Sequence, residues 1–357
     1  MRAIYFLLLA VVWLFPPPAL GQGTNEVLLS QTENAYNPIP SPDGQLIAYV
    51  KTGWGRRFPA SGLGRSNLRS EIGVMTLSGD VLDRSPLADA FLFGWTGSGR
   101  ELICYRDGRF MLVGPHGGIS RDATEDGGDE GHTLSERVAF LSKSNTFVWV
   151  EHDDSPPTAI LTEHDRIAKS LAMMGNLVVP SPDERYLAVA GNGMDLWVYD
   201  TALRSWADLG KADIHPDKDW EYIKPSWNPW FPDGSRLAFF SGQRLIVASP
   251  DGRQKTTLLN STQKAGLPVP SPDGRYVAYA TFVPRLRKLR PDLTFWGGTE
   301  IWTVPADGTG GPKQITLPSE DTAYDLNWAG NTRLVFDRIA DTPFYSHARL
   351  WALAVAR

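Results

Sequence analysis

The sequence predicts an all-β fold in which one unit is repeated along the chain. Three observations lead to this prediction. A Ser-Pro-Asp-Gly turn, or a near copy of it, recurs at a nearly regular spacing. Each copy is followed by a short apolar run that is rich in β-branched and aromatic residues. The 357 residues include 34 Gly and 27 Pro, which favours short strands joined by many turns. A repeat of this kind indicates a propeller or a solenoid.

The turn itself has a physical basis. Pro presets the first turn angle, Asp bonds its own backbone, and Gly accepts a positive φ. The four clearest copies are Ser41-Pro42-Asp43-Gly44, Ser181-Pro182-Asp183-Glu184, Phe231-Pro232-Asp233-Gly234 and Ser271-Pro272-Asp273-Gly274. Weaker copies begin near Trp95, Ser142 and Trp328, which makes seven units.

Each unit continues with the same pair of elements. The strands expected directly after the turns are Leu46–Val50, Leu102–Tyr105, Phe147–Val150, Tyr186–Ala190, Leu237–Phe240, Tyr276–Ala280 and Leu334–Phe336. A second hairpin is expected to start with the strands Ile72–Thr76, Met111–Val113, Ala159–Leu161, Leu196–Tyr199, Leu245–Val247 and Ile301–Val304. Each unit is therefore expected to have four antiparallel strands, a to d, which is the composition of a propeller blade.

The ends of the chain complete this pattern. The seventh unit stops after its third strand, Leu350–Val355, while Glu26–Ser30 forms an unassigned strand near the N-terminus. Pairing these two segments would bury two otherwise unpaired edges. We therefore expect a seven-bladed β-propeller whose ring is closed by the N-terminal strand, with six or eight blades as alternatives.

The repeat also resembles a known family. The Ser-Pro-Asp-Gly turn, the strand Val277-Ala278-Tyr279, the run Ile301–Val304 and the turn Ala306-Asp307-Gly308 resemble the repeats of TolB-like propellers. The resemblance covers nearly all of the chain beyond its first residues. It is specific for the repeat rather than for any one protein, so it implies the propeller fold and not the partners of TolB.

The first 21 residues are typical of an export signal. Arg2 is positive, Ala3–Phe15 is apolar, and Ala19-Leu20-Gly21 fits the small-residue rule for cleavage. The alternative is an uncleaved anchor, for which the apolar stretch is short. We expect residues 1–21 to be a cleavable signal peptide, residues 22–357 to form one domain, and the protein to be periplasmic or secreted.

Charge and motifs restrict the function. A net charge of −5 argues against a general nucleic-acid binder, and no later segment could span a membrane. Cys104 is the only cysteine and lies in an apolar strand, which favours a buried residue over a nucleophile. No catalytic motif and no histidine pair at metal-ligand spacing are present, so we expect no catalytic residue, no metal and no cofactor.

The a–b and c–d turns should lie on one face, and the b–c and d–a loops on the other. The long loops all belong to the second face, where binding residues are usual. The b–c loops 51–70 and 281–299 contain nine basic residues and one acid, Asp292. A third long loop is expected over 337–349, in a neighbouring unit.

Arginine guanidinium groups bind carboxylates through paired hydrogen bonds, and aromatic side chains supply contact area. These three loops therefore predict a docking patch for an acidic partner. The candidate ligand-binding residues are Arg56, Arg57, Arg287, Lys288, Arg290, Trp296, Tyr345 and His347. The alternative is that they are ordinary solvated loop residues.

Two d–a connections on the same face are also long. The acidic residues between Asp122 and Glu136 suit Ca²⁺ by chemistry but match no EF-hand spacing, so a solvated loop is favoured. In the second connection, Trp227 and Trp230 are expected to pack between blades, while Trp220 and Tyr222 could line the mouth of the central channel.

The sequence therefore favours an exported, monomeric, non-enzymatic binding module for a protein, a peptide or an envelope component. The alternative is a propeller enzyme, such as a hydrolase or lactonase, with a metal in the central channel.

Overall fold

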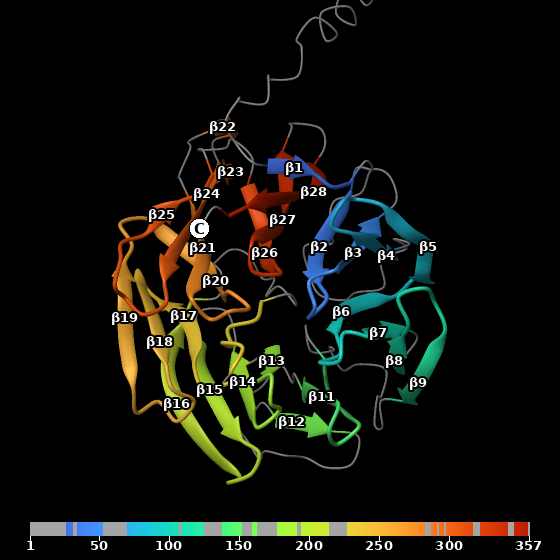
Figure 1. The fold of residues 1–357 in the computed structure, drawn as a ribbon, viewed down its shortest axis with the longest axis horizontal. Helices are drawn as coiled ribbons and strands as arrows, with labels where there is room; N and C mark the ends of the chain where they lie inside the picture. The colour runs from blue at the N-terminus through green and yellow to red at the C-terminus, as the bar shows by residue number, and fades with distance from the viewer. Residues whose placement is uncertain are drawn as a thin grey trace, which may run out of the picture.

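The structure is a computed structural model, shown as a ribbon in Figure 1. It describes residues 26–30, 34–52, 70–106, 109–124, 138–151, 159–162, 177–190, 194–213, 227–282, 287–290, 293–295, 298–316, 322–341 and 346–355. Within these ranges all regular secondary structure consists of β-strands, as expected for an all-β fold.

The strands form sheets arranged around a common centre, which is the arrangement of a β-propeller (Figure 1). Among the described residues, five sheets have four strands, two have three, and one is a separate two-stranded hairpin. All strand pairs are antiparallel.

The first three sheets follow the chain from its N-terminal side. They consist of β2 (Ala35–Pro40), β3 (Leu46–Thr52), β4 (Ser70–Thr76) and β5 (Val81–Ala88); β6 (Phe91–Trp95), β7 (Leu102–Arg106), β8 (Arg109–Val113) and β9 (Ile119–Thr124); and β10 (Ala139–Leu141), β11 (Thr146–Glu151) and β12 (Ala159–Thr162).

Four further sheets and the hairpin complete the described part. They consist of β13 (Leu177–Pro180), β14 (Tyr186–Ala190), β15 (Met194–Asp200) and β16 (Ser205–Ala212); β17 (Leu237–Ser241), β18 (Arg244–Ala248) and β19 (Lys255–Asn260); β20 (Lys264–Pro270), β21 (Tyr276–Phe282), β24 (Thr299–Pro305) and β25 (Lys313–Gln314); β1 (Glu26–Leu28), β28 (Ser346–Ala354), β27 (Arg333–Asp341) and β26 (Thr322–Ala329); and the hairpin β22 (Arg287–Arg290) and β23 (Leu293–Phe295).

Two sheets depart from the expected four strands. In the β17–β19 sheet, the place of the first strand is taken by an isolated bridge between Trp230 and Leu237. Trp230 therefore meets this sheet at a single bridge and does not form a ladder with it. In the β10–β12 sheet, the segment expected to supply a fourth strand lies outside the described residues.

Tryptophan side chains connect neighbouring sheets near the inner strands. The indole N–H groups of Trp95, Trp230 and Trp328 donate to the carbonyls of Ile39, Val179 and Val269, at 2.8, 2.9 and 2.9 Å. Each acceptor lies directly before a proline in the first strand of the preceding sheet. These bonds satisfy main-chain carbonyls across the seam between sheets, where the ladders of the sheets themselves do not reach.

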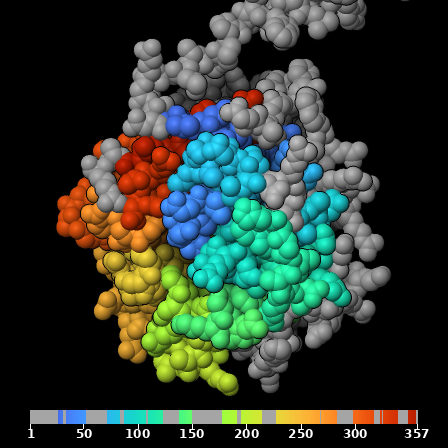
Figure 2. Space-filling view, turned by 45° about the vertical axis from the view of Figure 1, so that its right-hand side comes forward, coloured from blue at the N-terminus to red at the C-terminus, as the bar shows by residue number. Residues whose placement is uncertain are grey.

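The N-terminal strand completes the C-terminal sheet, as the sequence predicted. Strand β1 pairs with β28 in the register Glu26↔Leu353 to Leu28↔Trp351. The space-filling view in Figure 2 shows the red C-terminal strands against the blue N-terminal ones. We call the sheet of β26, β27, β28 and β1 the closing sheet.

A buried ion pair reinforces this closure. The Arg338 guanidinium makes two bonds to the Glu26 carboxylate, at 2.7 and 3.0 Å, and their side chains are 11% and 6% exposed. Phe336 and Trp351 lie against the same guanidinium, with centroid distances of 5.3 and 5.2 Å. Strand β1 is only three residues long, so this pair adds a specific attachment to a short ladder.

Candidate functional site

The structure describes only half of the predicted docking residues. Arg287, Lys288 and Arg290 lie in β22, and His347 lies in β28. The four others, Arg56, Arg57, Trp296 and Tyr345, lie outside the described residues. Figure 1 draws β22, β23, β28 and β1 at the same edge of the ring.

The expectation of a plain loop over residues 281–299 is wrong. Strand β21 runs on to Phe282, and the hairpin β22–β23 follows before β24 begins at Thr299. The hairpin belongs to neither neighbouring sheet, since β21 pairs directly with β24. A sequence signal for it existed, because Pro291-Asp292 is a turn-forming pair between two short runs.

The expected loop over residues 337–349 is also mostly strand. Strands β27 and β28 pair through Asp341↔Ser346, so that only residues 342–345 separate them. Arg338 belonged to the expected basic loop, but its guanidinium is bound to Glu26 instead of facing solvent. Sequence composition could not reveal this partner, which lies at the other end of the chain.

The opposite face is built from the repeated turns, several of which share one hydrogen-bond pattern. In three of them the Ser41, Ser181 and Ser271 hydroxyls donate to the aspartate two residues later, at 2.6, 2.5 and 2.6 Å. Each serine oxygen also accepts the N–H of the residue that begins the next strand, at 2.9 to 3.0 Å. Ser249 and Asp251 repeat the motif in a c–d turn.

These hydrogen bonds stabilise the ionised aspartates. The Ser41 hydroxyl and the Gln45 N–H hold the pKa of Asp43 below its ordinary value. The Ser249 hydroxyl and the Arg253 N–H lower the pKa of Asp251 in the same way. A carboxylate that accepts such bonds is favoured in its charged form, so these turn residues are engaged in holding the backbone.

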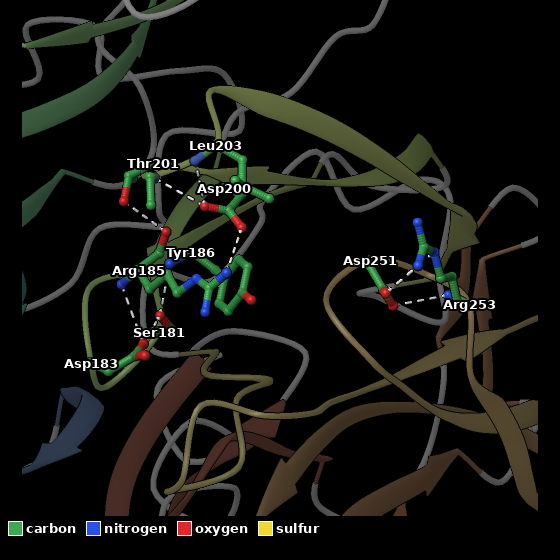
Figure 3. Close-up of polar contacts among 10 residues, drawn as sticks. Ser181, Asp183, Arg185, Tyr186, Asp200, Thr201, Leu203, Asp251 and Arg253 are labelled. Carbon is green, nitrogen blue, oxygen red and sulfur yellow. Dashed lines mark hydrogen bonds and ion pairs between the residues drawn. The ribbon is translucent and has the colours of Figure 1, made fainter.

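Figure 3 shows how one turn connects to its neighbours. Arg185 donates to Asp200 at 3.1 Å and lies over the Tyr186 ring. Tyr186 stacks on Trp230 of the next sheet, with centroids 6.1 Å apart. In a second pair drawn in the same view, Arg253 Nε lies 3.6 Å from Asp251 Oδ2. The arrangement links turns and sheets, and Arg185 and Arg253 each lie beside a carboxylate.

Other expectations can be checked at single residues. Trp227 and Trp230 are buried and donate to Pro268 and Val179 on either side, which confirms that they pack between sheets. Cys104 is buried, and burial raises the pKa of its thiol. This favours the inert interpretation of Cys104 over a nucleophile.

Several features that the sequence singled out cannot be placed. Trp220, Tyr222 and residues 125–137 lie outside the described part. Among the described residues, no group of three or more His, Cys, Asp or Glu side chains is arranged to hold a metal ion. In the same residues, no helix is long and apolar enough to cross a bilayer.

Comparisons with known proteins agree with the architecture. The β-propeller domain of Cps50 (Swd1) from Myceliophteria thermophila superposes with a TM-score of 0.56 over 93% of this chain and 100% of that domain, at 13% identity. The fold is a β-propeller. At this identity the match indicates the fold alone, and no family model matches the sequence.

Two further matches are more limited. A structure described as TolB from Agrobacterium tumefaciens has a TM-score of 0.42 and 14% identity, over 77% of this chain and 94% of that one. A protein of Streptomyces coelicolor described as a tricorn protease homolog is 34% identical over 111 residues. That match covers 27% of this chain and 9% of the relative.

Proposed function

We propose that this propeller is a binding module for a protein or peptide partner, which it engages through a basic surface on the b–c face. This surface, called here the hairpin surface, consists of the β22–β23 hairpin with Arg287, Lys288 and Arg290 and of the start of β28 with His347. The observation that carries the proposal is the hairpin itself, which is an addition to the repeated sheet. Insertions of this kind on a rigid scaffold are where propellers acquire binding specificity.

The proposal includes a ring of seven blades. Support comes from the five four-stranded and two three-stranded sheets, and from the bridge at Trp230 that marks a missing inner strand. The order of the sheets around the ring follows the sequence, and β1 supplies the outer strand of the last one. Six or eight blades would require a different division of these sheets.

The positive charges of the hairpin surface favour an acidic ligand. Among acidic ligands, we propose a peptide. Arginine and lysine bind carboxylates by charge-assisted hydrogen bonds. The relative described as a tricorn protease homolog supports a peptide, because proteases act on peptides. We further propose that residues 1–21 direct export and that the domain 22–357 works as a periplasmic or secreted monomer.

The test combines partner capture with a matched control. The tagged domain is used to capture proteins from an envelope fraction, and the affinity of the purified partner is then measured. Replacing Arg287 and Arg290 by Glu should weaken binding by about 10-fold or more, because two charged contacts become repulsive. The control carries Arg100→Glu and Arg253→Glu, two exposed arginines of the opposite face. Equal capture by both variants would exclude the hairpin surface.

The alternative is a propeller enzyme of the hydrolase or lactonase kind with a metal in its central channel. The description of the relative as a protease homolog is the observation that favours it. Such an enzyme should gain thermal stability from Ca²⁺ or Zn²⁺, since a ligand that binds only the folded state raises the melting temperature. A melting temperature that neither metal changes argues against this alternative.

A further inference from the structure

A hollow of about 620 Å³ lies between the β2–β5 sheet and the closing sheet, on the face of the repeated turns. Three turns line it, and they come from both ends of the chain. Its lining residues are Asp43, Gly44, Gln45, Leu46, Thr76, Leu77, Ser78, Ala329, Gly330, Thr332 and Arg333. The volume falls in the range of small-ligand sites. We call this hollow the seam pocket.

The local sequence at this seam differs from that at two others. At two other seams the turn glycine faces a proline ring of the preceding turn: Gly99 faces Pro42, and Gly274 faces Pro232. In the closing sheet, Gly330, Asn331 and Thr332 alone join Ala329 to Arg333, a shorter turn without proline. A Cβ on Gly44 would lie 2.4 Å from the Gly330 nitrogen, so the two turns touch at their backbones. The turn of the closing sheet therefore presents no proline ring to this seam.

The pocket holds two opposite charges that do not meet. Arg333 is exposed, and within the described residues no hydrogen bond or ion pair holds its guanidinium. Arg236 occupies the matching position in another sheet, but its guanidinium rests on the Phe231 ring at 4.3 Å. Across the pocket, Asp43 uses one carboxylate oxygen for its own turn and has no cation paired with it among the described residues.

The remaining lining is suited to a peptide chain. Leu46 and Leu77 are partly exposed and supply apolar contacts, whereas the Thr76 and Ser78 hydroxyls bond to each other and Ser78 donates to Asp80. A single guanidinium beside a carboxylate favours a monoanion with nearby N–H donors over a dianionic phosphate, which Asp43 would repel. A peptide carboxylate has this combination of groups.

We propose that the seam pocket binds a short peptide through a carboxylate on Arg333, with the N–H groups of the peptide directed to Asp43. The carboxylate could be a C-terminus or an Asp or Glu side chain, because both present the same anion. This site lies on the face opposite the hairpin surface and does not depend on it.

The test uses three peptide probes labelled with an uncharged BODIPY fluorophore and fluorescence anisotropy with the full chain. The first is labelled Gly-Gly-Leu with a free C-terminal carboxylate, and the second is the same peptide amidated. The third, labelled Gly-Asp-Leu-amide, carries its only carboxylate on a side chain. We expect at least one carboxylate probe to bind about 10-fold more tightly than the amidated Gly-Gly-Leu peptide, the usual scale of a charge-assisted contact.

Two variants decide whether the pocket is responsible. Arg333→Ala should abolish the preference for a carboxylate, whereas the matched control Arg236→Ala should keep it. Arg333→Ala should retain the melting temperature, because Arg333 is exposed, and this excludes a loss caused by unfolding. Equal binding of carboxylate and amide, failure of every probe to bind, or an unchanged preference in Arg333→Ala would overturn the proposal. The Arg287→Glu and Arg290→Glu changes should leave the preference intact, which separates this site from the hairpin surface.

Discussion

At the scale of single residues, Glu184 is the one non-glycine residue at the last position of the four clear turns. It stands where the other clear turns have glycine and adopts the same left-handed conformation, with φ of 58°. Its carboxylate accepts the backbone N–H groups of Ser142 and Lys143 in the preceding sheet, at 2.7 and 2.9 Å. The conformational cost of a side chain at positive φ is offset here by a contact across the seam that glycine could not make.

We predict that Glu184→Ala destabilises the protein by about 1 to 2 kcal/mol, because the backbone strain stays while both hydrogen bonds are lost. Glu184→Gly should be about 1 kcal/mol more stable than Glu184→Ala, since only glycine relieves the strain. Urea denaturation of the three proteins measures both differences. If the alanine and glycine variants unfold at the same urea concentration, strain at this position is not significant.

At the scale of elements, the indole bonds show how neighbouring sheets are attached. Each sheet satisfies its own ladder, so the inner strands need separate donors for the carbonyls that face a neighbour. Trp230 supplies one to Val179, while its ring stacks on Tyr186. Trp197 provides a contrast, because its buried indole nitrogen has no hydrogen-bond partner among the described residues.

We predict that Trp230→Phe costs about 1 to 3 kcal/mol, because it leaves the Val179 carbonyl buried without a donor. Trp197→Phe removes a similar volume but no hydrogen bond, so it should be neutral or slightly stabilising. Thermal or urea unfolding of both variants gives the comparison. A similar loss in the two variants would assign the effect of Trp230 to packing alone.

At the scale of the whole molecule, stability depends on how the ring closes. The attachment of β1 consists of a short ladder, the bond from the Leu350 N–H to the Ser30 hydroxyl at 3.0 Å, and the Glu26–Arg338 pair. A propeller gains from this arrangement because a strand from one end of the chain covers the sheet edge left by the other end.

We predict that Glu26→Ala destabilises the protein by about 3 kcal/mol or more, because Arg338 would remain buried without its counter-ion. The control is Asp122→Ala, which breaks the pair with Arg109, where both side chains are about half exposed. That change should cost less than about 1 kcal/mol. Comparable losses in the two variants would mean that the closing pair contributes no more than a surface pair.

The sequence by itself determined the scaffold of this protein. The bonds that define each turn join residues two to five positions apart, so Ser271, Asp273 and Tyr276 carry the turn within a single hexapeptide. The same local pattern located the strands and suggested that β1 would complete the closing sheet. The sequence also showed that the segment of β22 is basic, although it did not lead us to predict the β22–β23 hairpin.

Only the tertiary structure decided which side chains meet across the seams. Arg338 fell within the expected loop 337–349, yet its side-chain partner Glu26 lies 312 positions away. The seam pocket likewise combines turns from both ends of the chain, and one of these turns is short and lacks proline. Contacts within a turn follow from spacing along the chain, whereas contacts between sheets depend on the curvature of the closed ring, and local sequence does not encode that curvature.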